Sequence, residues 1–335
     1  MLSSGAMTTI ARLLGLLLVL AALPARAADT VNLGTVPTLG DAPLICAIER
    51  GYFKAEGIDA TMQSFRNAQD MMPLLARNGL DMIGGAMGVA YFNAVGRGLP
   101  VLYILNRSKT PVNHNLMVRA DLKDQIRTPK DLKGRAVGMT GIGSTIDFEM
   151  AKVLASAGLT LADIDRKDLG LNAIPVAFKN GGIDAGLEIS PFIEVAETEN
   201  AVRWIDPQDY IGHPVEISGM MVNTDWAAAH AELLTRFTVA YIKGVRCYLE
   251  AYAHGPNRGE LLDMMVKDTP LKNRDTYDHM AWFAVDPNAL IDKASVMELQ
   301  DFFIAQGYLK ERLPIERLVD ERYAEAALNI VGRAP

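Results

Sequence analysis

Cysteine is scarce in this chain of 335 residues, which has only Cys46 and Cys247. Their wide separation excludes the CxxC spacing of redox and zinc sites. An oxidising compartment would permit one disulfide between them. The alternative is that both are small, buried apolar residues with no bond between them.

Basic residues are also few, with 33 Lys and Arg against 40 Asp and Glu and a formal net charge of −7. The sequence has no run of Lys and Arg and no alternation of basic with aromatic residues. Binding to phosphate backbones depends on clustered basic residues, so the composition disfavours a nucleic-acid partner. An acidic balance of this kind is ordinary for a secreted protein.

The common catalytic signatures are missing. The five histidines form no HExxH motif and no pair at metal-ligand spacing, and no Gly-x-Ser-x-Gly elbow occurs. Gly141-Ile142-Gly143 follows a predicted strand, but Ile146 stands where a dinucleotide-binding fingerprint has its third glycine. We therefore expect no catalytic residue, no metal ion and no cofactor.

A run long enough to span a membrane is absent too. The apolar run after Arg12 extends only from Leu13 to Leu23 and ends in Pro24-Ala25-Arg26-Ala27, whereas a transmembrane helix needs about 20 residues. A positive start, a short apolar core and a small-x-small ending are typical of a secretory signal. We predict a signal peptide over residues 1–28, cleaved near Ala27 or Ala28, and hence a periplasmic protein. The alternative is an N-terminal membrane anchor.

Removal of the signal peptide would lower the basic count from 33 to 31 and bring the net charge to about −9. No cysteine lies near the cleavage point to carry a lipid, so we expect a freely diffusing protein. The roughly 307 residues that remain exceed what one core usually organises, and no linker rich in Pro or Ser divides them. We therefore expect two lobes joined by crossing strands and a short hinge.

Strand and helix patterns alternate along the chain, which favours βαβ units and an open α/β sheet in each lobe. The predicted strands cover residues 31–36, 58–65, 81–83, 101–105, 116–118, 135–139, 184–188 and 217–222. The predicted helices cover 41–54, 67–78, 87–95 and 145–157. Another begins near Ser190-Pro191, with Ser190 as its cap and Pro191 in its first turn, and the chain after residue 224 is mostly helical, with Thr224 as an N-cap. We assign residues 29–113 plus 219–335 to lobe 1 and 114–218 to lobe 2.

One internal similarity supports a duplicated lobe. A helix followed by Asn78-Gly79-Leu80-Asp81 in the first series matches a helix followed by Gly181-Gly182-Ile183-Asp184 in the second. We expect the glycine in each to take the left-handed conformation that ends the helix, before a buried strand. The alternative is chance, because Gly-x-Asp before a strand is common in α/β proteins.

Four segments resemble one family, the substrate-binding proteins of nitrate, sulfonate and taurine ABC importers, which share a domain with NMT1/THI5-like proteins of pyrimidine-precursor synthesis. The segments are Ala47 to Ile58 (AIERGYFKAEGI), Asn78 to Asp81, Asp131 to Gly138 (DLKGRAVG), and Gly181 to Ala185 with Pro191 beyond it. The resemblance implies an α/β, two-lobed periplasmic-binding-protein fold of type II, each lobe an open, mostly parallel sheet flanked by helices, with a small molecule between the lobes. It implies the importer's permease and ATPase as partners. Family members often carry Glu immediately before that proline, whereas this chain has Ser190, with Glu188 two residues further back.

Ligands of open α/β sheets lie beyond the carboxyl ends of the strands, where loops and helix N-termini offer backbone N–H groups. Three loops meet this description, at 35–39, 84–88 and 141–145. From them we expect ligand contacts from Thr35, Thr38, Leu39, Met87, Gly88, Gly143, Ser144 and Thr145. For each hydroxyl the alternative is that it only caps its own helix.

Two charged residues point to opposite ligand chemistries. Arg66, followed by Asn67, could clamp a carboxylate or sulfonate, or could be a solvated loop residue. Glu188, near Ser190, ends an apolar strand and could accept hydrogen bonds from an amine or aminopyrimidine, or pair with a protein cation. His114 lies where the chain is expected to pass from lobe 1 to lobe 2, so its side chain could face the ligand. The alternative is that it has only a structural role. All five residues are candidate ligand contacts, and the three helix N-termini favour an organic anion.

The sequence therefore predicts a monomeric, periplasmic solute-binding protein of an ABC importer that is not an enzyme. Its lobes would close around a small molecule by a hinge motion. The alternative is an enzyme on the same fold. The resemblance implies that such enzymes are intracellular and use a cofactor-bearing lysine and a Cys-rich segment, and neither Cys46 nor Cys247 lies in such a segment.

Overall fold

The computed structural model describes residues 27–269 and 271–335. The predicted signal peptide lies outside the described residues except for its last two, so export and the cleavage point stay predictions. Among the described residues, no helix combines the length and the apolar character that crossing a bilayer requires.

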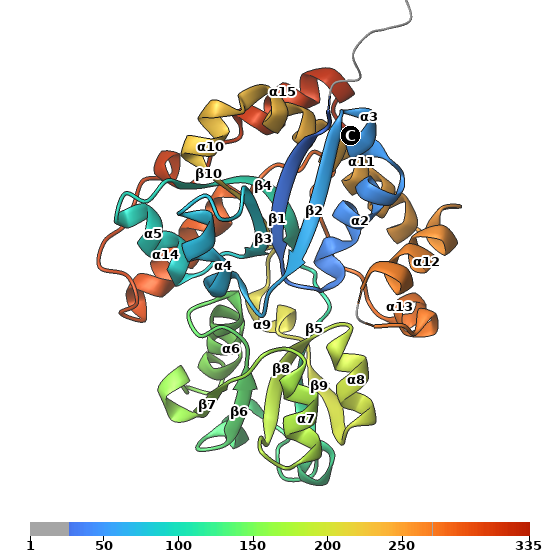
Figure 1. The fold of residues 1–335 in the computed structure, drawn as a ribbon. Coiled ribbons are helices and arrows are strands. Elements are labelled where there is room, and N and C mark those ends of the chain that lie inside the picture. The colour runs from blue at the N-terminus through green and yellow to red at the C-terminus, as the bar shows by residue number, and fades with distance from the viewer. Residues whose placement is uncertain (1–26, 270) are drawn as a thin grey trace, which may run out of the picture.

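The described chain forms two lobes, each built on one five-stranded sheet (Figure 1). The sheet of lobe 1 has the order β2-β1-β3-β10-β4, with bounds β1 Asp29–Thr35, β2 Ile58–Ser64, β3 Met82–Ala86, β4 Val101–Lys109 and β10 Glu216–Asn223. The sheet of lobe 2 has the order β7-β6-β8-β5-β9, with bounds β5 His114–Arg119, β6 Ala136–Met139, β7 Asp165–Asp168, β8 Ala185–Ile189 and β9 Ala201–Ile205.

Each sheet is mixed, with a single strand that runs against the rest. In lobe 1 this strand is β10, antiparallel to β3 and β4, and in lobe 2 it is β5, antiparallel to β8 and β9. The other pairs are parallel. The expected two-lobed fold with mostly parallel sheets is therefore confirmed, and the reversed strands are those by which the chain enters lobe 2 and returns to lobe 1.

Helices cover both faces of each sheet (Figure 1). Lobe 1 carries α2 Ala42–Glu49, α3 Tyr52–Ala55, α4 Ala68–Leu75, α5 Val89–Gly96, α10 Thr224–Ala229, α11 Ala231–Tyr252, α12 Arg258–Asp268, α13 Arg274–His279, α14 Lys293–Ala305 and α15 Arg322–Val331. Lobe 2 carries α6 Thr145–Ala155, α7 Ala173–Lys179, α8 Phe192–Thr198 and α9 Gln208–Ile211. Short 3₁₀ turns are η1 Leu39–Asp41, η2 Ala120–Leu122, η3 Pro129–Leu132, η4 Leu161–Asp163 and η5 Ile315–Arg317.

The two faces of the lobe 1 sheet bury separate cores. One core joins the sheet to α2, α11 and α12, and the other joins it to α4, α5 and α14. The interior strand β10 is buried along its whole length, as a strand covered on both faces must be, whereas only the first residue of the edge strand β2, Ile58, is buried. Cys46 in α2 and Cys247 in α11 form a disulfide within the first core.

The internal similarity corresponds to one repeated structural role. The Asp81 carboxylate accepts the backbone N–H of Asn32 in β1 at 2.7 Å, and the Asp184 carboxylate accepts that of Ala136 in β6 at 3.2 Å. Each aspartate thus joins the start of the third strand in the order of its sheet, β3 or β8, to the second strand, β1 or β6. The expected left-handed glycine occurs only in lobe 2, at Gly181, because Asn78 takes the left-handed position in lobe 1.

Three other local predictions differ from the structure. The helix predicted over 41–54 breaks into α2 and α3 at Gly51, whose φ of 70° ends α2. Asn223, rather than Thr224, caps α10, since its side chain accepts the N–H groups of Asp225 and Trp226. Ser190 does not cap α8, because its hydroxyl donates to the Glu194 carboxylate at 2.9 Å.

The lobe boundaries placed at 113/114 and 218/219 stay a prediction. The strand β5, which lies in the second sheet, begins at His114. The strand β10, which lies in the first sheet, begins at Glu216. The connections between the lobes run between β4 and β5 and between β9 and β10.

Candidate functional site

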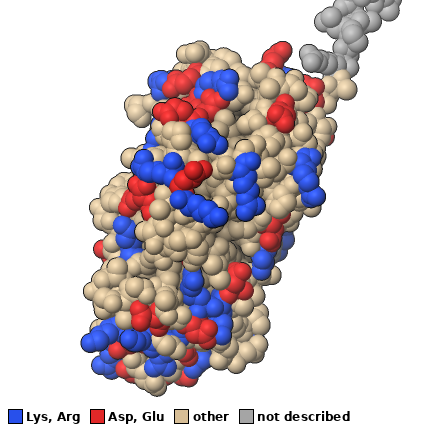
Figure 2. Space-filling view, turned by 90° about the vertical axis from the view of Figure 1, so that its left-hand side faces the viewer, with Lys and Arg blue, Asp and Glu red and all other residues tan. Residues whose placement is uncertain are grey.

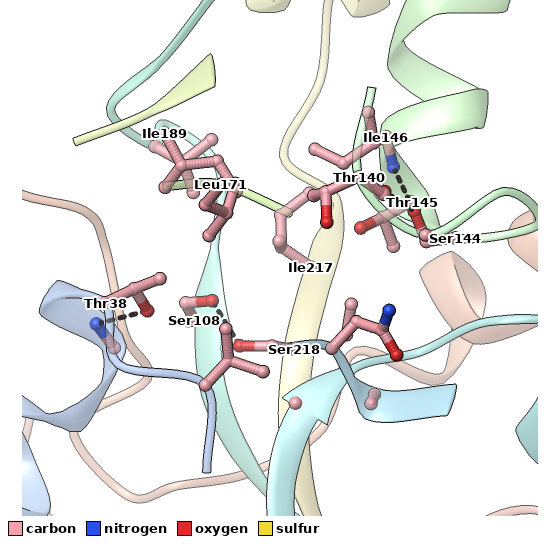
Figure 3. A pocket seen from close by; sticks show the side chains of 18 of the residues that line it. Thr38, Ser108, Thr140, Ser144, Thr145, Ile146, Leu171, Ile189, Ile217 and Ser218 are labelled. Atoms are coloured by element: carbon pink, nitrogen blue, oxygen red, sulfur yellow. Dashed lines mark hydrogen bonds between the residues drawn. The ribbon is translucent and has the colours of Figure 1, made fainter. Parts of the chain in front are cut away.

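A pocket lies between the carboxyl ends of the two sheets, and residues of both lobes line it (Figure 3). Its space is about 710 Å³, counting the solvent at its mouth. The pocket therefore lies where an open α/β sheet offers loops and helix starts to a ligand.

The structure brings seven of the thirteen predicted site residues together in this pocket. They are Thr38, Leu39, Arg66, Asn67, His114, Ser144 and Thr145. Two of their hydroxyls also cap helices, as the alternative for hydroxyls predicted: Thr38 accepts the Gly40 N–H and Ser144 accepts the Ile146 N–H, each at 3.2 Å. Capping holds these hydroxyl oxygens at the pocket wall in fixed positions.

The other six predicted residues do not line the pocket. Thr35 is buried on the far side of η1, and Met87 belongs to the core of α4 and α5. Ser190 is fully buried and bonded to Glu194. Gly88 and Gly143 contact each other between the lobes, as described below.

Glu188 is fully buried beneath the pocket, in β8. One of its carboxylate oxygens accepts the Ile189 backbone N–H at 3.0 Å, and the other has no hydrogen-bond partner. Burial, with a smaller contribution from the nearby Glu194 carboxylate, raises the pKa of Glu188 well above its usual value. Among the described residues, no protein cation forms a hydrogen bond with this carboxylate.

Sequence reasoning missed Arg107, the most buried cation of the pocket wall. Its guanidinium donates to the Asp41 carboxylate at 2.6 Å, and both side chains are only 4% exposed. It also donates to the Ser218 hydroxyl at 3.3 Å, which in turn lies 2.6 Å from the hydroxyl of Ser108 (Figure 3). Burial raises the pKa of Asp41, and the charge of Arg107 acts in the opposite direction.

His114 reaches the pocket from the first residue of β5. Its Nδ1 lies 2.9 and 3.0 Å from the two carboxylate oxygens of Glu149, in α6. Both side chains are buried. The pair therefore fixes the imidazole in one orientation at the pocket wall.

Three residues that line the pocket have a buried polar atom without a hydrogen-bond partner. The atoms are the guanidinium Nε of Arg107, the amide nitrogen Nδ2 of Asn113 and the hydroxyl Oγ1 of Thr140. Buried polar groups in native proteins are almost always satisfied, so each such atom needs an explanation. A molecule in the pocket would supply the missing partners.

The rest of the wall is largely apolar. Ile146, Leu171 and Ile189 of lobe 2 lie across the pocket from Ser108 and Ser218 of lobe 1, with Ile217 between them (Figure 3). No group of three or more metal-ligating side chains occurs among the described residues.

Beside the pocket the lobes touch each other directly. The backbone N–H of Val89 in lobe 1 donates to the Gly143 carbonyl of lobe 2 at 2.7 Å. A Cβ atom on Gly88 would lie 2.6 Å from the same oxygen, and Gly143 has φ of 79°, so glycine at both positions allows this contact.

A second contact joins α6 of lobe 2 to α14 and the segment after it. The rings of Phe148 and Phe302 pack edge to face with centroids 5.4 Å apart. Beyond them, Asp147 accepts from Arg166 at 3.1 Å and from the Tyr308 hydroxyl at 3.3 Å, and Arg166 donates to the same hydroxyl at 2.9 Å. We call Asp147, Arg166 and Tyr308 the interlobe clasp. Figure 2 shows this side of the molecule, where basic and acidic side chains are interspersed above and below a largely uncharged waist.

Two lobes on five-stranded mixed sheets, with a lined pocket between them, define the periplasmic-binding-protein fold of type II. The chain belongs to the family described as NMT1/THI5 like, which matches residues 40–253. The resemblance noted from the sequence is thereby confirmed.

Known proteins agree with this assignment. The chain is 29% identical over 162 residues to a 4-amino-5-hydroxymethyl-2-methylpyrimidine phosphate synthase of Schizosaccharomyces pombe, covering 48% of this chain and 44% of the relative. It is 25% identical over 211 residues to a formylaminopyrimidine-binding protein of Halalkalibacterium halodurans, covering 62% of each. The matches thus span less than two thirds of either relative.

Among solved structures, the alkanesulfonate-binding protein SsuA of Xanthomonas axonopodis pv. citri, bound to MOPS, has a TM-score of 0.71 at 18% identity. The match covers 89% of this chain and all 100% of SsuA. At this identity the likeness concerns the fold alone.

Proposed function

We propose that this chain is the periplasmic solute-binding component of an ABC importer, and that it captures a small organic molecule between its lobes. The observation that carries the proposal is the pair of buried, unpartnered polar atoms, Asn113 Nδ2 and Thr140 Oγ1, on the wall of a pocket lined by both lobes. A ligand bound there contacts lobe 1 and lobe 2 at once, and therefore favours the closed arrangement of the lobes.

The proposed partners are the importer's permease and ATPase in the inner membrane, and the proposed state is a monomer. The family and the fold support this assignment, and so does the N-terminal signal pattern, which would deliver the chain to the periplasm. Closure would present the shape that the membrane complex recognises.

The test begins with the mature protein purified from its native host. Mass spectrometry of the small molecules released on denaturation should find one compound per chain, and adding it back should raise the melting temperature by mass action. Small-angle scattering should show compaction on binding. A protein that releases nothing and whose dimensions do not respond to any candidate solute would contradict the proposal.

A pair of variants connects binding to the pocket. Asn113→Ala should weaken binding of the released compound by about 0.5–1.5 kcal/mol, the usual value of one hydrogen bond. Asn180→Ala is the matched control, because Asn180 is exposed at the end of α7. Equal affinities of the two variants would place the ligand elsewhere.

The second candidate function is an enzyme on this fold, which the 29% identity to a pyrimidine phosphate synthase favours. The two functions differ in what happens to the bound compound. Incubation with the released molecule should leave it chemically unchanged if the chain is a binding protein. Conversion by the purified protein would establish the enzyme instead.

A further inference from the structure

The cations on the pocket wall already have carboxylate partners in the protein. Of the described residues that line the pocket, only Arg66, Arg107 and His114 carry a basic side chain, and none carries an acidic one. Arg107 is bonded to Asp41 at 2.6 Å. The imidazole of His114 is bonded to the carboxylate of Glu149 at 2.9 Å.

Arg66, the cation expected to clamp an anion, lies at the mouth of the pocket. Its side chain is 50% exposed and pairs with Asp70 at 3.3 Å. The carboxylate of Asp168, in lobe 2, also interacts electrostatically with it. None of the three basic side chains therefore provides an unpaired positive charge for a ligand.

The helix starts at the pocket also have acidic residues beside them, two of which are the partners of Arg66 and Arg107. Each of η1, α4 and α6 has an aspartate in its first turn, namely Asp41, Asp70 and Asp147. A negative side chain there offsets the positive end of the helix dipole. Backbone donors are also in use, because the N–H groups of Gly40, Asp70 and Ile146 go to the capping side chains of Thr38, Asn67 and Ser144.

We infer that the ligand of this pocket is an uncharged molecule with an apolar body and at least one hydrogen-bond acceptor. The acceptor would receive the free N–H of Asn113 and the hydroxyl of Thr140, while the apolar body lies against Ile146, Leu171 and Ile189. A buried anion would lose its hydration without gaining an unpaired cation, which is costly. The inference rests on the proposed function and reverses the preference for an organic anion drawn from the helix N-termini alone.

Removing the carboxylate partner of Arg107 tests the inference directly. The probe is 1-butanesulfonate, an alkanesulfonate with an apolar tail, titrated calorimetrically against ligand-free protein at neutral pH. The Asp41→Asn variant frees the Arg107 guanidinium, and it should bind the probe at least about tenfold more tightly than the wild type, as a charge-assisted hydrogen bond predicts. The matched control is Asp301→Asn, which breaks an exposed Asp–Arg pair with the same 2.6 Å spacing away from the pocket.

Three results would overturn the inference. They are tight binding of the probe by the wild type, an Asp41→Asn variant that gains no affinity, and an equal gain in Asp301→Asn. If circular dichroism shows that Asp41→Asn does not fold, Asp70→Asn decides, because it frees the half-exposed Arg66 at the mouth and should give a smaller gain. Absence of that gain would also overturn the inference. A native ligand that proves to be anionic would refute this inference and leave the proposed binding function standing.

Discussion

The two lobes place an aspartate at the same point of the fold and use it differently. Asp41 in lobe 1 and Asp147 in lobe 2 each lie in the first helical turn after the second strand of their sheet order, β1 and β6. Asp41 pairs with Arg107 from its own lobe, at the pocket wall. Asp147 pairs with Arg166 and, across the gap, with Tyr308 of lobe 1.

The difference shows how a duplicated α/β unit acquires separate roles. The shared backbone topology determines where the aspartate lies. The strand that supplies the arginine determines whether the ion pair faces the pocket or the other lobe. In lobe 1 the arginine comes from β4 and faces the ligand space, whereas in lobe 2 it comes from β7 and faces the other lobe. Four experiments test whether the two lobes differ in this way, and the changes in stability or affinity that we expect decrease from the first to the fourth.

The largest effect concerns the disulfide, which only lobe 1 has. The Cys46–Cys247 bond closes a loop with a sequence separation of 201, and this loop contains the whole of lobe 2. Replacing both cysteines with alanine should lower the free energy of unfolding by about 5 kcal/mol in the chain-entropy account. Urea denaturation with and without reductant measures it, and reductant should not affect the double variant. Unchanged stability would show that the unfolded chain gains no conformational entropy when the disulfide is absent.

The second experiment compares the two arginines. Arg107→Met leaves Asp41 buried without a cation and should cost about 3–5 kcal/mol of unfolding free energy. Arg166→Met should cost less, because Arg166 is 24% exposed and Asp147 keeps the Gly143 N–H and the Tyr308 hydroxyl. Chemical denaturation at neutral pH measures both losses. Equal losses would mean that the two pairs play the same structural part.

The third experiment uses a position where the lobes differ in residue type. Glu188 follows Asp184 by the same four residues that separate Gly85 from Asp81. Because burial raises the pKa of Glu188 above its ordinary value of 4.5, the folded protein holds a proton that the unfolded chain releases. Stability should therefore fall as the pH rises from about 4.5 to the folded-state pKa, with a slope of up to about 1.4 kcal/mol per pH unit.

Glu188→Gln should remove that slope. Urea denaturation of both proteins at a series of pH values gives the difference in unfolding free energy. The difference should grow in favour of the variant as the pH increases above 4.5. A difference that stays constant with pH would show that Glu188 holds no extra proton in the folded state.

The smallest effect concerns the interlobe clasp. Tyr308→Phe removes the hydroxyl that joins Asp147 and Arg166 to lobe 1, and should weaken binding of the native ligand by about 1 kcal/mol, or roughly fivefold. Tyr252→Phe, at the exposed end of α11, is the control. Calorimetric titration measures both, and identical affinities would mean that the clasp does not favour closure.

Much of this fold could be predicted because its signals are local. The buried run 217–222 and the capped helix starts gave most strands and helices near their observed bounds. The edge strand β7 was not predicted, since its sequence Asp165–Asp168 is entirely charged and it is a strand only through its pairing with β6. Periodicity cannot reveal a strand whose side chains bury so little.

The candidate site could be predicted only in part for a similar reason. Loops at helix starts are visible in sequence, and these supplied Thr38, Ser144 and Thr145. Arg107 was not visible as a site residue, because its partner Asp41 lies 66 positions away and joins it only when β4 packs beside the first loop. Asn113 and Thr140 are notable only for lacking a partner, and that property exists only in the folded chain.

The contact between Val89 and Gly143 has an evolutionary consequence. Its donor and its acceptor are both main-chain atoms, so a change of side chain at Val89 leaves the bond available unless proline removes the N–H. The groups that face the pocket are side chains. Descendants of this protein can therefore change which compound they recognise, one substitution at a time, and still keep the main-chain hydrogen bond that joins the two lobes.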